Sequence, residues 1–98
     1  MKLWLDDTRP PPIDSNDWVW VKTVANAATI LMYAPVREAS LDHDLGEGCE
    51  TGYDLCNWME RNNIWPLESC VVHSMNPVGR MQMQVIIDKH YMAGGRDV

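Results

Sequence analysis

Carboxylate side chains follow two short apolar segments of the chain, where each segment gives way to a polar loop. Asp6 and Asp7 follow one segment, and Asp42 and Asp44 follow another. If the segments are parallel strands, these carboxylates meet at the edge of the sheet where α/β proteins bind ligands. Four like charges repel one another there unless a divalent cation lies between them, and sites rich in oxygen ligands suit Mg²⁺ or Mn²⁺. A single Asp is more often a turn or cap residue, but the agreement between separate strand ends favours a metal site.

A second signal is Arg80, which lies in the first turn of a helix expected to begin after Asn76. A cation in that turn opposes the positive end of the helix. The placement is explained if an anion such as phosphate binds at the free amides of the helix N-terminus. Gly79 would permit close approach of the backbone, and Arg9 could reach the same anion from the other side. The alternative is that Arg80 pairs with a nearby aspartate or is simply solvated.

The histidines divide into two groups. His43 lies between two aspartates, which favour the charged form of its imidazole, and His73 ends an apolar segment beside Ser74. Either imidazole could act as a general acid or base in phosphate chemistry, although lone histidines are more often structural. His90 falls on the apolar stripe of a helix, where a packed structural role is the simpler interpretation.

The elements that must position these residues alternate between strands and helices. Short apolar runs predict strands, and helical periodicity with capping residues predicts helices. The expected strands are Lys2–Asp6, Trp18–Thr23, Ala39–Asp42 and Ser69–Ser74. The expected helices run from Asn26 to Ala34, from the capping box of Thr51 and Asp54 to Asn63, and from Asn76-Pro77 to a stop at Gly94-Gly95.

This alternation predicts a parallel α/β sheet with helices packed on its faces. Residues 8–17 hold three prolines and put coil where the first helix of such a fold is expected. An extended segment of this length still spans a strand, so the second strand can also run parallel. The 98 residues fit a single domain over 1–98.

The composition excludes several classes of protein. The chain is 46% hydrophobic and 22% charged, which is typical of a globular rather than a disordered protein. It has no apolar run long enough for a transmembrane helix, and carboxylates near its start argue against a signal peptide. Three cysteines without metal or disulfide spacing favour a reducing, cytoplasmic location. The net charge of −6 counts against binding of long nucleic acids.

Four separated motifs resemble those of the cyclic-phosphate-processing receiver-like domain, and they span residues 2 to about 83 in the order of that family. The motifs are Leu5-Asp6-Asp7-Thr8-Arg9 with Pro11, Ser40-Leu41-Asp42-His43-Asp44-Leu45-Gly46, Thr51-Gly52-Tyr53-Asp54 with Trp58, and His73-Ser74-Met75-Asn76-Pro77-Val78-Gly79-Arg80. The resemblance implies a shortened response-regulator receiver fold. We therefore expect a small flavodoxin-like, three-layer fold with a four-stranded parallel sheet in the order 2-1-3-4 and about three helices.

The site expected from these residues has three parts. The metal ligands are Asp6, Asp7 and Asp42, with Asp44 either a further ligand or the partner of His43. The substrate contacts come from the cations and polar groups on either side, which are Arg9, Ser74, Asn76 and Arg80. The catalytic residues are His73 as the general acid, His43 as the base and Asp42.

Three functions remain open at this point. The first is a metal-dependent phosphoesterase for a cyclic phosphate or cyclic nucleotide, and the resemblance includes small phage-encoded domains that could act on host signalling. The second is a phosphoacceptor module, which the absence of a suitably placed lysine after a fifth strand opposes. The third is a non-catalytic binder that sequesters a cyclic nucleotide. The base, the ring linkage and the oligomeric state are left open.

Overall fold

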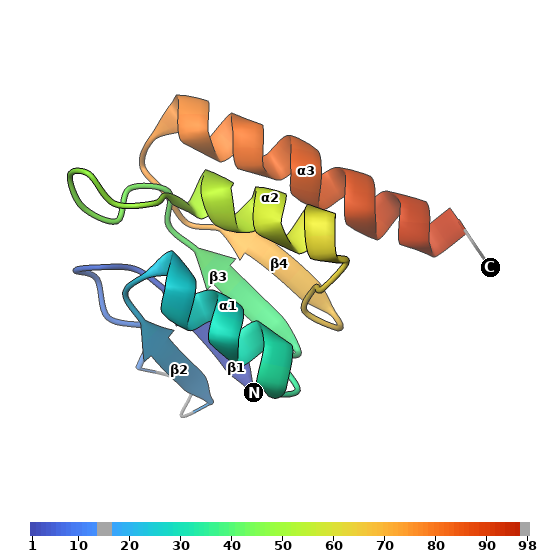
Figure 1. The fold of residues 1–98 in the computed structure, drawn as a ribbon, viewed down its shortest axis with the longest axis horizontal. Helices are drawn as coiled ribbons and strands as arrows, with labels where there is room; N and C mark the ends of the chain where they lie inside the picture. The colour runs from blue at the N-terminus through green and yellow to red at the C-terminus, as the bar shows by residue number, and fades with distance from the viewer. Residues whose placement is uncertain (14–16, 97–98) are drawn as a thin grey trace.

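The computed structural model describes residues 1–13 and 17–96, with side chains up to residue 92. Part of the proline-rich coil expected over residues 8–17 therefore lies outside the described residues. The strands are β1 (Lys2–Leu5), β2 (Trp18–Val21), β3 (Glu38–Leu41) and β4 (Ser69–Val72). The helices are α1 (Val24–Tyr33), α2 (Gly52–Asn62) and α3 (Pro77–Arg96). Figure 1 shows this order along the chain.

The four strands form one parallel sheet in the order β2-β1-β3-β4, as predicted. In the registers of β1, Leu5 lies opposite Val21 of β2 and opposite Leu41 of β3. The carboxyl ends of these strands therefore lie level with one another. Because the residues after Leu5 and Leu41 are Asp6 and Asp42, the topology alone brings two of the predicted ligands side by side.

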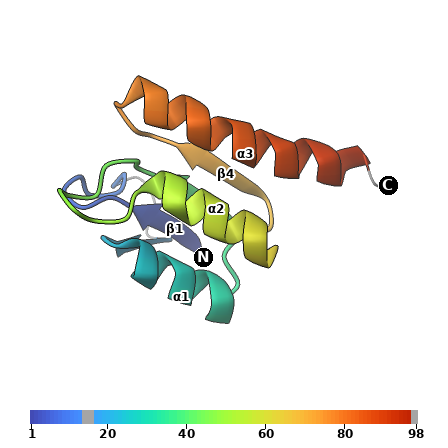
Figure 2. The ribbon, with the colours of Figure 1, turned by 45° about the horizontal axis from the view of Figure 1, so that its top comes forward.

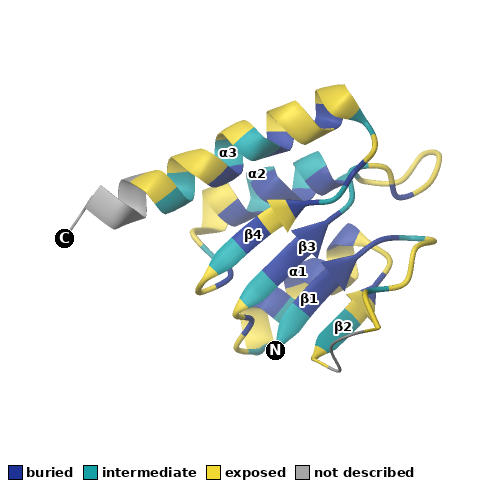
Figure 3. Cartoon of the chain, turned by 180° about the vertical axis from the view of Figure 1, so that it is seen from behind, coloured by how far each residue is buried: buried dark blue, intermediate teal, exposed yellow. Residues whose placement is uncertain are grey.

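The helices cover one face of the sheet. The core joins α1, α2 and α3 to alternate strand residues such as Leu3, Leu5 and Leu41, which lie on the same face. Figure 2 shows the three helices side by side, and the view from behind in Figure 3 shows the strands with no helix in front of them. The expected three-layer arrangement is therefore wrong for the described residues, which form two layers. The cause is the proline-rich coil after β1, which takes the place of a helix that would cover the second face.

The predicted strands are one or two residues too long at their carboxyl ends, and β3 also begins one residue earlier than expected. After β2, Thr23 is the N-cap of α1, and its hydroxyl accepts a hydrogen bond from the Asn26 amide at 3.2 Å. The helix therefore begins at Val24 rather than Asn26. At β1, β3 and β4, the residues that were predicted as strand but lie beyond its observed end are polar, and they leave the sheet to form the site.

The signals for the later helices are confirmed at three of their four ends. Thr51 and Asp54 form the capping box of α2, and Asn63 ends that helix in the left-handed conformation with φ of 51°. Asn76 caps α3 by accepting a hydrogen bond from the Gly79 amide at 3.0 Å. The predicted stop at Gly94-Gly95 is wrong, because α3 continues to Arg96. Glycine inside a helix costs only about 1 kcal/mol relative to alanine, so it permits a stop without enforcing one.

The core is built from leucine, valine, alanine, isoleucine, methionine and cysteine. Leu3, Leu5, Leu41, Leu55 and Met59 are fully buried between the sheet and the helices. Each such side chain contributes roughly 1.5–3 kcal/mol through removal of its apolar surface from water. Within the described chain, no helix is both long and apolar enough to cross a membrane.

This core predicts the reactivity of the cysteines. Cys56 and Cys70 are buried, whereas Cys49 is exposed. Burial raises the pKa of the Cys56 thiol to about 12 and the pKa of the Cys70 thiol well above its usual value. We expect Ellman's reagent to modify a single thiol in the folded protein and the remaining thiols only after denaturation. Cys49→Ser should abolish the reaction of the folded protein, and rapid modification of that variant would contradict the core described here.

Candidate metal and phosphate site

Three aspartates gather at the carboxyl edge of the sheet. Asp6 and Asp7 follow β1, and Asp42 follows β3, where its backbone amide donates to the Leu5 carbonyl at 2.9 Å. One carboxylate oxygen from each of the three lies within 4.8 Å of the others. Asp6 is buried, and Asp7 and Asp42 are half-buried. The sequence prediction that Asp6, Asp7 and Asp42 meet is confirmed, and we call these residues the acidic trio.

The acidic trio carries a charge that the described chain leaves largely uncompensated. No Lys or Arg among the described residues forms an ion pair with any of the three carboxylates. Two unit charges 4.8 Å apart repel by about 3.5 kcal/mol at an effective dielectric constant of ~20. A divalent cation between the carboxylates would turn this repulsion into attraction. Three hard carboxylate oxygens match the ligand preference of Mg²⁺ and Mn²⁺, so these residues fit such a metal.

Asp6 is held in place at both carboxylate oxygens. Oδ1 accepts hydrogen bonds from the backbone amides of Thr8 at 2.9 Å and Arg9 at 2.7 Å, and Oδ2 lies 3.0 Å from Nε2 of His73. Burial raises the pKa of Asp6, but the amides of Arg9 and Thr8 and the bond from His73 outweigh it and hold the pKa below its usual value. Asp6 is therefore ionised and oriented at neutral pH.

Two indole groups clamp the loop that follows Asp6. Trp4 donates its ring N–H to the Arg9 carbonyl, and Trp20 donates its ring N–H to the Asp6 carbonyl, both at 2.7 Å. Neither role was predicted from the sequence. The sequence shows only that β1 and β2 both contain tryptophan. Its periodicity does not show which backbone carbonyl accepts a hydrogen bond from each indole N–H.

His73 sits between Asp6 and Ser40. Its Nδ1 lies 2.8 Å from the Ser40 hydroxyl, and its ring stacks on Trp4 with 4.0 Å between centroids and 3° between planes. A carboxylate only accepts, so Nε2 donates to Asp6, and in the neutral ring Nδ1 accepts from Ser40. With both ring nitrogens engaged, His73 is placed to position Asp6 rather than to exchange a proton with a ligand. The contact of Ser40 with His73 was not predicted from the sequence.

His43 forms a second carboxylate–imidazole pair. Its Nδ1 lies 2.9 Å from Oδ1 of Asp44, and its backbone amide donates to Oδ1 of Asp42 at 2.8 Å. The hydrogen bond from His43, with a further one from Asn76, holds the pKa of Asp44 below its usual value despite slight desolvation. Asp44 was expected to be either a further metal ligand or the partner of His43. The structure shows the second arrangement, and Asp44 lies outside the acidic trio.

Gly79 makes room for this imidazole. A Cβ atom at Gly79 would lie 2.4 Å from two ring carbons of His43. The close approach predicted at Gly79 is thus made by a histidine side chain, whereas the sequence indicated a bound anion. The first turn of α3 and the loop after β3 are locked together at this point.

The remaining predicted residues lie on the α3 side or on the β1 loop. The buried Ser74 hydroxyl accepts from the Asn76 amide at 3.1 Å, and the Asn76 side-chain amide lies 3.4 Å from Oδ2 of Asp44. Arg80 is exposed and lines a pocket with Ser74. Arg9 is also exposed, and in the part of the chain that the structure describes neither guanidinium pairs with a carboxylate. The structure therefore brings Ser74, Asn76 and His43 together but does not bring the two arginines into contact with the trio.

The position of His73 makes a prediction about metal affinity. Removing a group that orients a ligand typically weakens metal binding by roughly 10–100-fold. We expect His73→Ala to weaken Mn²⁺ binding to this degree, measured by electron paramagnetic resonance of free Mn²⁺, and Ser40→Ala to weaken it less. His90→Ala is the matched control. His90 stacks on Trp65, and among the described residues it makes no contact with the acidic trio. Equal Mn²⁺ affinity of His73→Ala and wild type would contradict the positioning role.

Comparison with known proteins agrees with this geometry. No curated protein matches the chain. A comparison with protein families matches residues 1–89 to the family described as the cyclic-phosphate processing receiver domain. The match covers all four strands, α1, α2 and the part of α3 that borders the site. The chain therefore belongs to the cyclic-phosphate processing receiver domain family.

Proposed function

We propose that this protein is a metal-dependent phosphoesterase that opens a cyclic phosphate diester, such as that of a cyclic nucleotide. The observation that carries the proposal is the acidic trio next to the His43–Asp44 pair, with Asp42 and His43 adjacent in the chain and joined by a hydrogen bond. A metal site and a general base at one sheet edge are the parts that hydrolysis of a phosphodiester needs.

The metal would be held by Asp6, Asp7 and Asp42. When bound there, Mg²⁺ or Mn²⁺ supplies a Lewis acid for a phosphoryl oxygen and lowers the pKa of a water ligand. The chain's own contribution is to keep Asp6 ionised through the amides of Thr8 and Arg9, and oriented through His73.

His43 is the proton carrier in this proposal. Asp44 accepts from Nδ1 of His43, which leaves Nε2 as the basic nitrogen of the neutral ring. His43 takes a proton from the attacking water as the new P–O bond forms. The P–O bond of the ring then breaks, and the same proton goes to the leaving alkoxide, which yields a phosphate monoester. The role of general acid that the sequence assigned to His73 passes to His43, because both nitrogens of His73 are engaged.

The substrate phosphate would be held by groups on both sides of the trio. Arg80 in the first turn of α3 and Arg9 on the β1 loop are exposed cations. Guanidinium groups bind phosphate oxygens through paired hydrogen bonds and stabilise negative charge that builds up in the transition state. Asn76 joins the first turn of α3 to the His43–Asp44 pair, because its carbonyl accepts from the Arg80 backbone amide at 2.9 Å and its side chain contacts Asp44.

The lysines argue against the phosphoacceptor alternative. Lys2 pairs with Glu38 at the amino ends of the strands, Lys89 pairs with Glu60, and Lys22 lies 4.8 Å from the Trp20 ring. None of these contacts involves the acidic trio. The described residues also form no fifth strand, at whose end a phosphoacceptor module would place its lysine. A sequestering role differs from hydrolysis only in the fate of the ligand, so the experiment below separates the two.

The test is incubation of the pure protein with Mn²⁺ and a panel of cyclic mononucleotides and dinucleotides, with products followed by ³¹P nuclear magnetic resonance. We expect a monoester product from at least one cyclic phosphate. His43→Ala should lower turnover by roughly 10²–10⁴-fold. Arg80→Ala should mainly raise KM, because its contact with phosphate exists before the transition state. Tight binding with intact ligand would instead support the sequestering function, and labelling of Asp42 by acetyl phosphate would support the phosphoacceptor function.

Gly79→Ala offers an independent test of the role of His43. The added methyl group must displace the His43 ring, since its nearest ring atoms would be 2.4 Å away. We expect a loss of turnover approaching that of His43→Ala, while Mn²⁺ affinity remains that of the wild type because the trio is untouched. Wild-type turnover in a folded Gly79→Ala protein, checked by circular dichroism, would exclude His43 as the proton carrier.

A further inference from the structure

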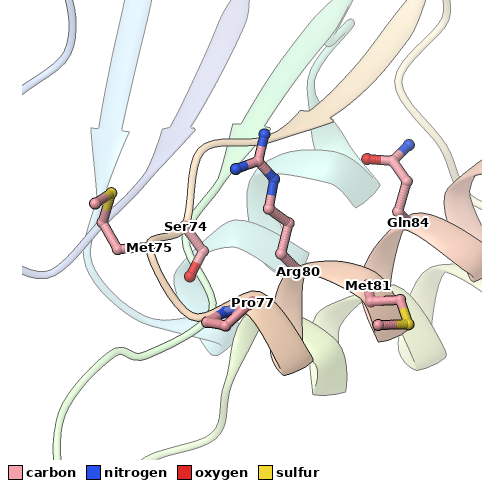
Figure 4. Close-up of a pocket in the computed structure, with 6 residues that line it drawn as sticks. All are labelled: Ser74, Met75, Pro77, Arg80, Met81 and Gln84. Carbon is pink, nitrogen blue, oxygen red and sulfur yellow. The ribbon is translucent and has the colours of Figure 1, made fainter.

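A pocket of about 530 Å³ opens between the end of β4 and the first two turns of α3. Its lining residues combine one cation, two small polar groups and apolar walls, and they are Ser74, Met75, Pro77, Arg80, Met81 and Gln84. Figure 4 shows Arg80 rising from α3 between the β4 end and Gln84. The volume falls in the usual range for small-molecule sites, roughly 300–1,000 Å³. The phosphate contacts proposed above use only Arg80 and Ser74 of this set, so the other four residues are unassigned.

The charge of the pocket selects for an anion. Arg80 is exposed, and no carboxylate of the described chain pairs with it. The nearest acidic residue on the same helix face, Asp88, instead accepts a hydrogen bond from Gln84 at 2.8 Å. An unpaired guanidinium in a chain of net charge −6 is a local positive site that attracts a phosphate group.

The amide of Gln84 adds a directed acceptor. Its Nε2 donates to Asp88 one helical turn away, which favours one orientation of the amide. No described residue donates a hydrogen bond to the amide oxygen, and Figure 4 shows this oxygen turned toward Arg80. An acceptor in this orientation favours a ligand that carries an amino group at a suitable distance from its phosphate.

The apolar walls fit a flat ring. Met75 and Met81 are 83% and 66% exposed, so both present apolar surface to water at the pocket. Thioethers are flexible and polarisable, and they make favourable contacts with aromatic rings. Pro77 adds a rigid apolar surface between them. Covering these side chains with a ring would remove apolar surface from water.

We infer that this pocket is a nucleobase subsite, which holds an amino-bearing base such as adenine against Met75 and Met81, with its exocyclic amine on Gln84 and the cyclic phosphate on Arg80. The inference rests on the proposed function for the position of the phosphate. It narrows the substrate class from any cyclic phosphate to a cyclic nucleotide. Ser74 links the pocket to the site, because its hydroxyl bonds to the Asn76 amide and Asn76 contacts Asp44.

The test measures binding separately from turnover. Calorimetry with Mg²⁺ present would compare cyclic AMP in its 2′,3′ and 3′,5′ forms, the matching cyclic UMP, and ethylene phosphate, a cyclic phosphate without a base. We expect Met81→Ala to weaken binding of one form of cyclic AMP by about tenfold and to leave ethylene phosphate unchanged. Gln84→Leu should remove the preference for cyclic AMP over cyclic UMP, since uracil has no exocyclic amine. Met92→Ala is the matched control, an exposed methionine on the same helix outside the pocket.

A spectroscopic readout makes the result independent of the variants. In protein labelled at the methionine methyl groups, cyclic AMP should shift the resonances of Met75 and Met81 through the ring current of the base, and the resonance of Met92 should not move. If Met81→Ala and Gln84→Leu bind every ligand as the wild type does, or if no nucleotide binds, the subsite is wrong. If base-dependent binding is observed and no product forms, the subsite stands and the hydrolytic function fails.

Discussion

The repulsion among the carboxylates of Asp6, Asp7 and Asp42 is the constraint on which the rest of this structure depends. Parallel pairing of β1 with β3 places Asp6 beside Asp42, and the chain then brings Asp7 within 4.8 Å of both. Left to themselves, three such groups would turn away into water or take up protons. The fold prevents this with hydrogen bonds to the charged form of Asp6, and it thereby keeps a strongly negative, preorganised cluster that a divalent cation would complete.

One of those hydrogen bonds, from His73 at the end of β4, comes from across the sheet, and the helix-free face of the sheet makes room for it. Trp4 and Ser40 alternate with core residues along β1 and β3, so they lie on the face opposite the helices, where they meet the His73 ring. A helix on that face would compete for the same space. The proline-rich coil that replaces a helix after β1 leaves room for the stack of Trp4 on His73 and for the indole bonds to the acidic loop. The unusual connection and the organised Asp6 are therefore parts of the same arrangement.

Much of this could be predicted from the sequence, because its signals are local. Short apolar runs, the capping box at Thr51 and the Asn76 cap predict the elements, and parallel pairing then places Asp6, Asp7 and Asp42 together. The missed features depend on contacts between residues far apart in the chain. No local pattern shows that Ser40 bonds to His73, that Gly79 accommodates His43, or that Asp44 turns to His43 and away from the trio. The number of layers was missed because strand and helix alternation does not show which face of a sheet a helix covers.

The central claim is that the acidic trio holds a divalent metal, and the most direct measurement is anomalous diffraction from crystals of this protein grown with Mn²⁺. The account predicts a single strong anomalous peak between Asp6, Asp7 and Asp42, with a carboxylate oxygen of each residue bound to the metal. It also predicts that His73 remains bonded to Asp6 and that Asp44 remains with His43 when the metal is bound. A fully occupied Mn²⁺ peak elsewhere, or no peak at the trio at saturating Mn²⁺, would contradict the account.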